Sequence, residues 1–526
     1  MGATQTQKYP NGVVHTKLLA NWRNGKTRPM SYRRQQLLAL LSVVKERYSM
    51  IIEALVRDFK SRNEAALEVA SVIQEITDYL ENLDEWAEPE VVKTPIGNAF
   101  DTAKILYEPY GLWLNIAPWN FPIVLTLAPL IGAIAAGNAC VIKPSELAPN
   151  SAAIIKLILE EALDSDCYAV LSGAKEITTT ILKFKWDFIL YTGNSTVARI
   201  VMEAASKHLT PVALELGGKS PVFIDEKTAD LRIAARRIVW GKLMNAGQIC
   251  ITVDYCFIHP SIKEKFVKLI QEEITNFYGI ETKNNPDYPK IVLSRHVERI
   301  AKLLPNQNSP KSHGKIVYGG NYDVEERYFE PTVVVDLDIN EAPLMNEEIF
   351  GPILPIIEMP NVQSCIDYLK TKDKPLALYI FSDDQKYIDN ILNNISSGGV
   401  SINDILAHFL VPSLPFGGIG ESGMGSYHGI HSFKEFSHKR AMYQSTKYRS
   451  LEPLLTLRYP PAQLEQALPL NFTSYLYSNE PTSSFLGKLV NHTMSGVRWV
   501  LAAALVNFTG RADGKKFSFD KEPRNE

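Results

Sequence analysis

The residue best suited to covalent chemistry is Cys250, in the stretch Asn245-Ala-Gly-Gln-Ile-Cys250-Ile-Thr252, which follows a predicted helix. A thiol attacks carbonyl carbons as the thiolate, so nucleophilic cysteines lie in turns or at helix starts, where backbone N–H groups and water reach the sulfur. Gly247 and Gln248 predict such a turn. The alternative is a buried structural cysteine, the more common role of a lone thiol. The choice between them depends on which other groups the chain supplies.

Glu215 lies in the apolar segment Val212-Ala-Leu-Glu-Leu216. A carboxylate there is costly unless it is paired, hydrated in a cleft or protonated through a raised pKa. Its alternative role is a structural ion pair. A thiohemiacetal at Cys250 could pass hydride to a nicotinamide, which would leave a thioester on the sulfur. Water activated by Glu215 would then cleave this thioester. The combination predicts aldehyde oxidation, with Asn120 as a donor to the oxyanion. His408, with Asp404 beside it, is another possible partner for the thiol.

Strands, polar turns and helices alternate in the first half of the chain. Predicted strands at 111–117, 139–142 and 188–191 are each followed by a polar turn and a helix, at 123–136, 151–162 (with Ser151 as a possible cap) and 197–208. This alternation predicts a doubly wound parallel sheet, whose ligands bind at the carboxyl ends of the strands. The glycine fingerprint of dinucleotide folds is absent. Gly193 alone would allow close backbone approach, with the following helix N-terminus facing phosphate.

The remaining segments predict a scaffold and a second domain. Apolar residues at helical spacing make 27–86 a helical scaffold, and 91–92 with 104–107 predict a hairpin of the kind that serves assembly. A second domain starts near 212 and contains a helix at 230–244 and strands at 255–258, 375–381 and 398–403. Five glycines within 415–425 indicate close backbone packing or ligand approach; the alternative is a low-complexity linker.

Composition excludes several classes of protein. The chain has 526 residues, 45% of them hydrophobic, enough for a large core in two or three domains. A net charge of −3 provides no positive field for nucleic acid, so no nucleic-acid partner is expected. The five cysteines are scattered, without the spacing of a metal site, which predicts a reducing compartment and no metal: Cys140, Cys167, Cys250, Cys256 and Cys365.

A series of motifs in order resembles the aldehyde dehydrogenase superfamily of the class 3 type, the branch that contains membrane-associated fatty aldehyde dehydrogenases. The resemblance runs from about Gly25 to Gln444. The motifs are Gly25-Lys-Thr-Arg-Pro29 with Tyr32-Arg33 and Gln36-Leu37, Pro118-Trp-Asn-Phe-Pro122, Lys143-Pro-Ser-Glu146, Lys207-His-Leu-Thr-Pro211, Leu214-Glu-Leu-Gly-Gly-Lys-Ser-Pro221, Asn245-x-Gly-Gln-x-Cys250, Glu348-Ile-Phe-Gly-Pro352, Leu414-Pro-Phe-Gly-Gly418 and Ser422-Gly-Met-Gly425.

The resemblance implies an α/β fold of two doubly wound Rossmann-like domains, a small β oligomerisation element and a C-terminal amphipathic helix. It implies a dinucleotide-binding domain at 1–88 and 108–211, oligomerisation strands at 89–107 and 426–450, a catalytic domain at 212–425, an extension at 451–526, and a homodimer. The implied nucleophile is Cys250, the general base Glu215, and the oxyanion hole Asn120 with the Cys250 N–H. The implied residues for NAD, with NADP possible, are Trp119, Lys143, Glu146, Gly193, Asn194, Leu216, Glu348 and Phe350.

Two positions depart from the family pattern at the cofactor turn. Asn194 stands where the family usually has serine, and Ala198 replaces a helix glycine. Because Asn194 keeps a hydrogen-bonding side chain, we expect an altered cofactor affinity, and an altered preference between NAD and NADP, with binding retained.

The C-terminal extension predicts an amphipathic helix at 485–508, with apolar residues on one face and polar residues opposite. Its all-apolar end, 499–506, is too short to span a bilayer, which favours a helix lying in one leaflet at the cytosolic face of the endoplasmic reticulum, a lipid droplet or the mitochondrial outer membrane. The alternative is packing on the protein or on a dimer partner. At the other end, residues 1–6 match an N-myristoylation pattern or are a plain polar N-terminus.

The predicted activity is therefore NAD(P)-dependent oxidation of medium- and long-chain aliphatic aldehydes to carboxylic acids. Two alternatives remain: oxidation of aromatic or other soluble aldehydes, and a non-catalytic scaffold at a membrane surface.

Overall fold

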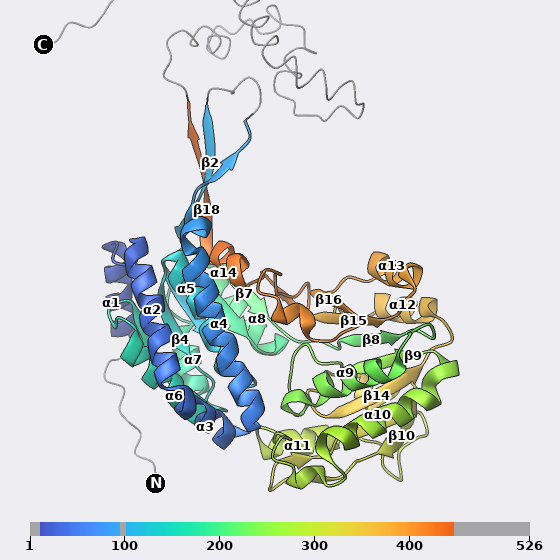
Figure 1. The fold of residues 1–526 in the computed structure, drawn as a ribbon. Helices are drawn as coiled ribbons and strands as arrows, with labels where there is room; N and C mark the ends of the chain where they lie inside the picture. The colour runs from blue at the N-terminus through green and yellow to red at the C-terminus, as the bar shows by residue number, and fades with distance from the viewer. Residues whose placement is uncertain (1–10, 95–100, 446–526) are drawn as a thin grey trace, which may run out of the picture. The chain divides into compact units, whose positions relative to one another are not determined.

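A computed structural model describes residues 11–94 and 101–445 of the chain (Figure 1). The described residues fall into two compact units, which lie within Met1–Ala87 with Glu108–His438 and within Glu88–Tyr107 with Lys439–Glu526. The predicted tail helix at 485–508 and the N-terminal pattern at 1–6 lie outside the described residues. Within the described ranges, no helix is long and apolar enough to cross a membrane.

The larger unit contains a sheet that, within its described residues, has six strands in the order β17-β7-β6-β3-β4-β5. All neighbouring pairs are parallel except β17 with β7, so the predicted doubly wound sheet is confirmed. The strands are β3 Leu112–Ile116, β4 Ala139–Lys143, β5 Tyr168–Val170, β6 Phe188–Thr192, β7 Val212–Glu215 and β17 Gly423–Met424.

A second sheet of the same unit has seven described strands in the order β10-β13-β14-β9-β8-β15-β16. Only β10 with β13 is antiparallel. The strands are β8 Pro221–Ile224, β9 Tyr255–Ile258, β10 His313–Tyr318, β13 Thr332–Leu337, β14 Ile353–Glu358, β15 Ala377–Phe381 and β16 Gly399–Ile402, and β11 Tyr322–Asp323 pairs separately with β12 Tyr328–Phe329.

Strand β7 differs from its expected place. We expected the segment from residue 212 to open the second domain, but β7 pairs with β6 in the first sheet, and the chain enters the second sheet at β8. The connection between them, 216–220, therefore runs from one sheet to the other. Glu215 closes β7 at the beginning of this connection.

The predicted scaffold at 27–86 is confirmed as three helices, and the helix expected at 123–136 is buried along all of its thirteen residues. This burial follows from its composition, which is apolar on every side. The helices of the unit are α1 Asn11–Arg23, α2 Met30–Glu46, α3 Tyr48–Asp58, α4 Arg62–Ala87, α5 Val124–Ala136, α6 Pro149–Ala162, α7 Lys175–Ile181, α8 Ser195–Ser206, α9 Leu231–Leu243, α10 Lys263–Tyr278, α11 Ser294–Ala301, α12 Val362–Lys370, α13 Gln385–Asn394 and α14 Gly429–Glu435.

The expected cap of α6 is wrong. The helix starts at Pro149, after Ala148, because proline is favoured in the first turn, where its missing N–H costs nothing. Ser151 lies inside the first turn instead. Its N–H and hydroxyl both donate to the carboxylate of Asp58, at 2.7 and 2.6 Å.

The smaller unit has a three-stranded sheet among its described residues, in the order β1-β2-β18. β1 Glu90–Val92 and β2 Thr102–Pro109 pair antiparallel, which confirms the predicted hairpin, and β18 Ser437–Gln444 follows.

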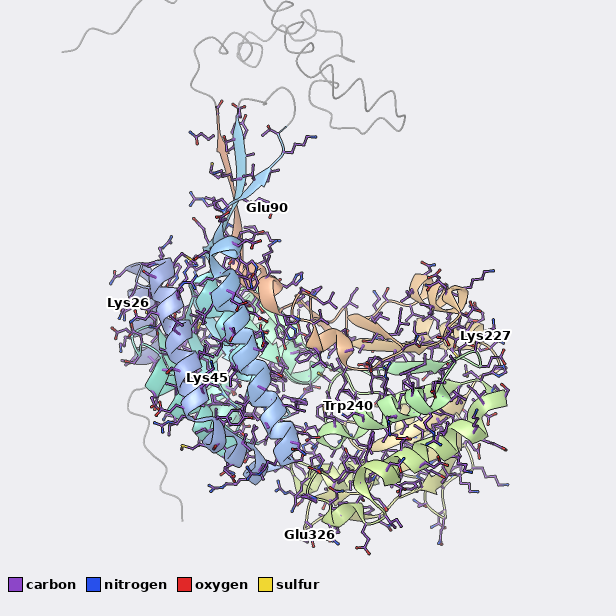
Figure 2. All side chains as sticks on the ribbon, in the orientation of Figure 1. Lys26, Lys45, Glu90, Lys227, Trp240 and Glu326 are labelled. Atoms are coloured by element: carbon purple, nitrogen blue, oxygen red, sulfur yellow. The ribbon has the colours of Figure 1, made fainter. Side chains whose placement is uncertain are left out.

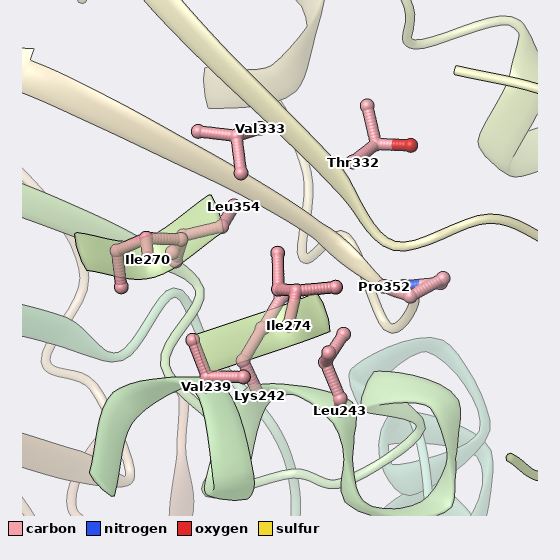
Figure 3. A pocket seen from close by; sticks show the side chains of 9 residues that line it. All are labelled: Val239, Lys242, Leu243, Ile270, Ile274, Thr332, Val333, Pro352 and Leu354. Carbon is pink, nitrogen blue, oxygen red and sulfur yellow. The ribbon is translucent and has the colours of Figure 1, made fainter. Parts of the chain in front are cut away.

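The core between α9, α10 and the second sheet contains one lysine. Lys242 lines a small cavity of about 10 Å³ together with eight residues that are apolar except for Thr332 (Figure 3). Lys242 is 1% exposed, and its Nζ has no hydrogen-bond partner in the described part of the chain. Burial lowers the pKa of Lys242 to about 8, because the charged ammonium loses its hydration.

We expect Lys242→Met to stabilise the protein at pH 7. The folded chain binds fewer protons at this site than the unfolded chain between its folded pKa of about 8 and its ordinary value of 10.5, so the stability of the wild type increases with pH across that window. At pH values below this window, burial of the charged lysine lowers the free energy of unfolding by on the order of 3 kcal/mol. A higher Tm of the variant at pH 7, with a difference that shrinks toward pH 10.5, is the expected result. The exposed Lys268→Met is the control, and a lower Tm of Lys242→Met at pH 7 contradicts the account.

Candidate active site

The turn before Cys250 runs through three successive left-handed residues. Asn245 and Ala246 both have φ 52°, and Gly247 has φ 74°. The predicted turn at Gly247 is confirmed, but the left-handed backbone begins two residues earlier. This conformation costs a non-glycine residue roughly 1–2 kcal/mol, although asparagine tolerates it better than alanine. The turn therefore needs support from outside itself.

Side-chain amides provide this support. Nδ2 of Asn245 donates to the carbonyl oxygen of Asn120 at 2.9 Å and to that of Gln248 at 3.1 Å. Nε2 of Gln248 donates to the carbonyl oxygens of Asn245 (2.9 Å) and Lys290 (3.1 Å). A Cβ on Gly247 would lie 2.3 Å from the carbonyl oxygen of Gly351, so this position requires glycine. The turn is fixed to the loop of Asn120 and to the loop that follows Glu348.

Cys250 is partly exposed and carries a free thiol. Burial of the sulfur among protein atoms raises its pKa, and the carboxyl groups of Glu348 and Glu215 raise it further, because a thiolate would lie near their negative charge. The N–H groups of Cys250 and Ile251 act in the opposite direction by hydrogen-bonding to the sulfur. The thiol is therefore protonated at rest, with donors placed to stabilise the thiolate once its proton leaves.

Glu215 is 2% exposed at the end of β7. Neither carboxyl oxygen has a hydrogen-bond partner, and no salt bridge links it to any described residue, so the ion-pair alternative finds no support in the structure. Burial raises the pKa of Glu215 well above its usual range, and Glu435 adds to the shift. An unpartnered buried carboxyl of this kind is typical of a proton acceptor in a site.

Asn120 follows β3 and is buried. Its Nδ2 donates to the carbonyl oxygen of Gln248 at 3.1 Å, in the turn that carries Cys250. An amide nitrogen has two hydrogens. The second is available to an oxygen bound near the thiol.

The cofactor residues expected from the resemblance lie on turns at the carboxyl ends of the parallel strands. Nζ of Lys143 is 2.5 Å from the Glu146 carboxylate after β4, and Asn194 caps α8 after β6, where its side chain accepts the N–H of Val197 at 3.0 Å. The N–H of Gly193 donates to the carbonyl oxygen of Glu215 at 2.9 Å, which links the turn expected to bind the cofactor to the backbone of Glu215.

These turns fit a dinucleotide. A capped helix N-terminus suits a pyrophosphate, and the Lys143–Glu146 pair offers both a donor and an acceptor to sugar hydroxyls. Asn194 keeps a hydrogen-bonding function in this chain as the cap, and Ala198 is buried in α8.

Glu348 and Phe350 lie on the loop before β14. The Glu348 carboxyl packs so tightly on Gly217 that a Cβ there would lie 2.1 Å from its Oε2. Burial and then the charge of Asp254 raise the pKa of Glu348 to about 8, against a hydrogen bond from the Gly218 N–H. Phe350 meets Trp119 edge to face, with ring centroids 5.5 Å apart. Leu216 is buried, and its N–H donates to the Ser422 carbonyl oxygen at 3.1 Å.

Sequence reasoning gave no role to Lys219 or Tyr427. Nζ of Lys219 donates to Asp254 (2.5 Å) and to the carbonyl oxygens of Leu344 (2.7 Å) and Glu347 (2.9 Å), so it anchors the loop of Glu348. The sequence feature that could have pointed to Lys219 is its place in the motif at 214–221. Tyr427 is buried with no partner for its hydroxyl among the described residues, and its pKa is raised by burial and then by Glu215 and Cys250. It lies two residues after the glycine-rich stretch at 415–425.

His408 takes a different role from the one considered for it. Its Nδ1 hydrogen-bonds to Oγ of Ser401 at 2.9 Å. The glycine-rich stretch at 415–425 serves close backbone packing, since a Cβ on Gly423 would lie 2.3 Å from the carbonyl oxygen of Leu214.

Comparison with known proteins agrees with this geometry. The model of the aldehyde dehydrogenase family matches residues 19–442. The chain belongs to this family. It is 48% identical over 440 residues to aldehyde dehydrogenase family 3 member A2 of Pongo abelii, covering 83% of this chain and 88% of the relative. It is 43% identical to the dimeric NADP-preferring aldehyde dehydrogenase of Mus musculus, covering 84% and 95%.

Solved structures agree as well. The substrate-bound state of Staphylococcus aureus AldH has a TM-score of 0.80 and 40% identity, covering 84% of this chain and 95% of that one. The glyceraldehyde-3-phosphate dehydrogenase GapN of Methanocaldococcus jannaschii, complexed with NADP, has a TM-score of 0.72 and 26% identity, covering 83% and 94%. The predictions of the family, the fold and an NAD(P)-dependent aldehyde dehydrogenase are confirmed.

We expect Glu348→Gln to change the reactivity of Cys250 only at alkaline pH. With a pKa of about 8, the Glu348 carboxyl is mostly neutral at pH 7 and charged at pH 9, where it opposes thiolate formation. Alkylation of Cys250 by iodoacetamide, followed by peptide mass spectrometry, should match the wild type at pH 7 and be about 3- to 10-fold faster at pH 9, since one pKa unit is a tenfold change in thiolate. The exposed Glu298→Gln is the control. Equal alkylation rates of the variant and the wild type at pH 9 contradict the conclusion that the Glu348 charge opposes thiolate formation at Cys250.

Proposed function

We propose that this enzyme oxidises medium- and long-chain aliphatic aldehydes to carboxylic acids through a covalent intermediate on Cys250. The observation that carries the proposal is the unpartnered, buried carboxyl of Glu215 beside a partly exposed thiol that its charge perturbs. The similarity to family 3 member A2 proteins, together with the class 3 motifs, supports the aliphatic substrate.

The sulfur of Cys250 attacks the aldehyde carbon to form a thiohemiacetal. The Nδ2 of Asn120 and the N–H of Cys250 donate to the oxygen on which negative charge develops, and one such donor is worth about 10²–10³ in rate. After oxidation, Glu215 accepts a proton from the water that cleaves the thioester, which releases the acid and restores the thiol. Its raised pKa makes the ionised Glu215 carboxylate a stronger base than an exposed glutamate.

The dinucleotide is held by the residues that the resemblance implied. Lys143 and Glu146 bind the adenosine ribose, Gly193 and Asn194 the pyrophosphate, and Glu348 the nicotinamide ribose, with packing from Trp119, Leu216 and Phe350. A nicotinamide held by these residues would supply the acceptor for the hydride that leaves the substrate carbon. The family includes members that use NAD and members that use NADP.

The proposed organisation places a dinucleotide-binding domain at 1–88 and 108–211 and a catalytic domain at 212–425, whose first strand, β7, pairs with the first sheet, with assembly as a homodimer through 89–107 and 426–450. A relative 43% identical to this chain is named as dimeric, which supports the dimer. The extension at 451–526 is proposed to associate with the cytosolic face of an intracellular membrane, on the amphipathic pattern of 485–508.

Replacement of the nucleophile tests the chemistry. Cys250→Ala should lower NADH production from decanal by on the order of 10⁴-fold or more, the scale of a lost nucleophile in a catalytic unit. Cys365→Ala, which removes a buried thiol on α12, should retain the activity. Undiminished NADH production by Cys250→Ala refutes the assignment of Cys250 as the nucleophile, whereas a wild type that produces no NADH from any aldehyde favours the scaffold alternative.

A chain-length series tests the substrate. Rates of the full chain on propanal, hexanal, decanal and hexadecanal, measured with NAD and with NADP, should give kcat/KM that rises with length, because each buried CH₂ contributes about 0.8 kcal/mol. Benzaldehyde is the comparison substrate. Equal kcat/KM across the aliphatic series, or a preference for benzaldehyde, contradicts the fatty substrate.

A further inference from the structure

The helical scaffold presents three charged side chains to the active-site loops. Lys60 lies in the connection between α3 and α4, two residues before α4 begins, and Glu64 and Glu68 share one face of the first turns of α4. The Lys60 and Glu68 side chains are 0% and 1% exposed. Burial of a lysine and a carboxylate is costly unless both charges are compensated, so their contacts indicate what this arrangement serves.

Lys60 contacts both loops of the proposed oxyanion hole. Its Nζ lies 3.3 Å from Oε2 of Glu68, donates to Oδ1 of Asn245 at 3.2 Å, and lies 3.8 Å from the ring centroid of Phe121. Asn245 begins the left-handed turn of Cys250. Phe121 directly follows Asn120.

The two glutamates hold the same loops through their backbone. Oε1 of Glu68 accepts the N–H groups of Ile123 (2.7 Å) and Val124 (3.1 Å) at the start of α5, where a negative charge also meets the positive end of the helix dipole. Oε1 of Glu64 accepts the N–H of Asn245 at 2.8 Å. Together with Lys60, they fix the loop before α5 and the turn after α9 to one helix.

Lys60 also determines how the Asn245 amide points. An ammonium only donates hydrogen bonds, so it holds the amide oxygen toward itself and directs Nδ2 toward the carbonyl oxygens of Asn120 and Gln248. The bond to Asn120 and the bond from Nδ2 of Asn120 to the carbonyl oxygen of Gln248 link the two loops directly. Without Lys60, the Asn245 amide loses the partner that orients it.

We propose that Lys60 is a positioning residue for aldehyde oxidation. Its ammonium, held between Glu68 and Asn245, places the Asn120 amide at the distance from Cys250 that stabilises the oxyanion. The inference rests on the proposed roles of Cys250 and Asn120.

A double-mutant cycle in the full-length enzyme tests the proposal. Lys60→Met keeps the aliphatic stem and removes the charge, and should lower kcat for decanal about 10- to 100-fold, up to the loss of one oxyanion donor, with the Kd for NAD within about twofold of wild type. In an Asn120→Ala background, the same substitution should lower kcat by less than about twofold, because residues that act through one another are not additive. Active sites are counted by iodoacetamide labelling of Cys250.

The matched control is Lys45→Met, an exposed lysine of α2 labelled in Figure 2, which should leave kcat unchanged. A wild-type kcat of Lys60→Met, or an equal loss in both backgrounds, overturns the positioning role while the proposed function stands. A wild-type kcat of Asn120→Ala instead overturns the oxyanion role of Asn120, and Lys60's role with it. A purely structural lysine would lower the Tm and leave kcat per labelled site unchanged.

If Lys60→Met does not fold, Glu68→Gln serves in its place. It keeps an acceptor for the amides of α5 and removes the charge that holds the ammonium. We expect a loss of kcat of about 3- to 10-fold that again disappears in the Asn120→Ala background. An unchanged kcat overturns the proposal.

Discussion

The side-chain amide of Asn245 joins the two loops on which the active site depends. Its Nδ2 bonds to the backbone of Asn120 and of Gln248, and its own backbone begins the left-handed turn that presents Cys250. That turn is strained because an alanine as well as an asparagine adopts the left-handed conformation. Hydrogen bonds of buried amides and the close approach of Gly247 to Gly351 hold the backbone in this conformation. Hydrogen bonds thereby hold the loops of the proposed nucleophile, Cys250, and of the proposed oxyanion donor, Asn120, together, although these residues are 130 positions apart in the sequence.

Burial without counter-ions sets the electrostatics of the site. The pKa values of Cys250, Glu215 and Glu348 are all raised, in each case first by desolvation. Burial therefore disfavours the charged form of each of the three groups. The charge that develops on the substrate oxygen meets fixed N–H donors of the backbone and of Asn120, an arrangement that stabilises the transition state more than the resting state.

The sequence predicted much of this arrangement, because its signals are local. The strand, turn and helix units follow from apolar runs and turn residues, and the thiol, the carboxyl in an apolar strand and the glycine-rich loop stand out as chemically unusual. The left-handed backbone at Ala246 has no signal in residue type. The pairing of β7 with β6 in the first sheet depends on contacts between distant segments, which residue types do not indicate. The helix α6 begins at Pro149 and not after Ser151, because proline is favoured in the first turn of a helix.

The supporting charges could not be assigned from sequence for a similar reason. The helical spacing of the charged residues Lys60, Glu64 and Glu68 is typical of a solvent-exposed helix face. Only the folded structure shows that they contact Asn245 and the start of α5. The roles of Lys219 and Tyr427 likewise follow from contacts with residues that are distant in the sequence. Their roles depend on tertiary contacts, whereas the proposed nucleophile and the proposed base stand out by their neighbours in the sequence.

The most direct test of the account is the fate of the acyl group in Glu215→Gln. Mixed with decanal and NAD, this variant should release about one NADH per active site and then stall, because water is no longer activated to cleave the thioester. Mass spectrometry should find the decanoyl group on the peptide that contains Cys250. Sustained turnover at the wild-type rate, or an acyl group on any other residue, contradicts the account.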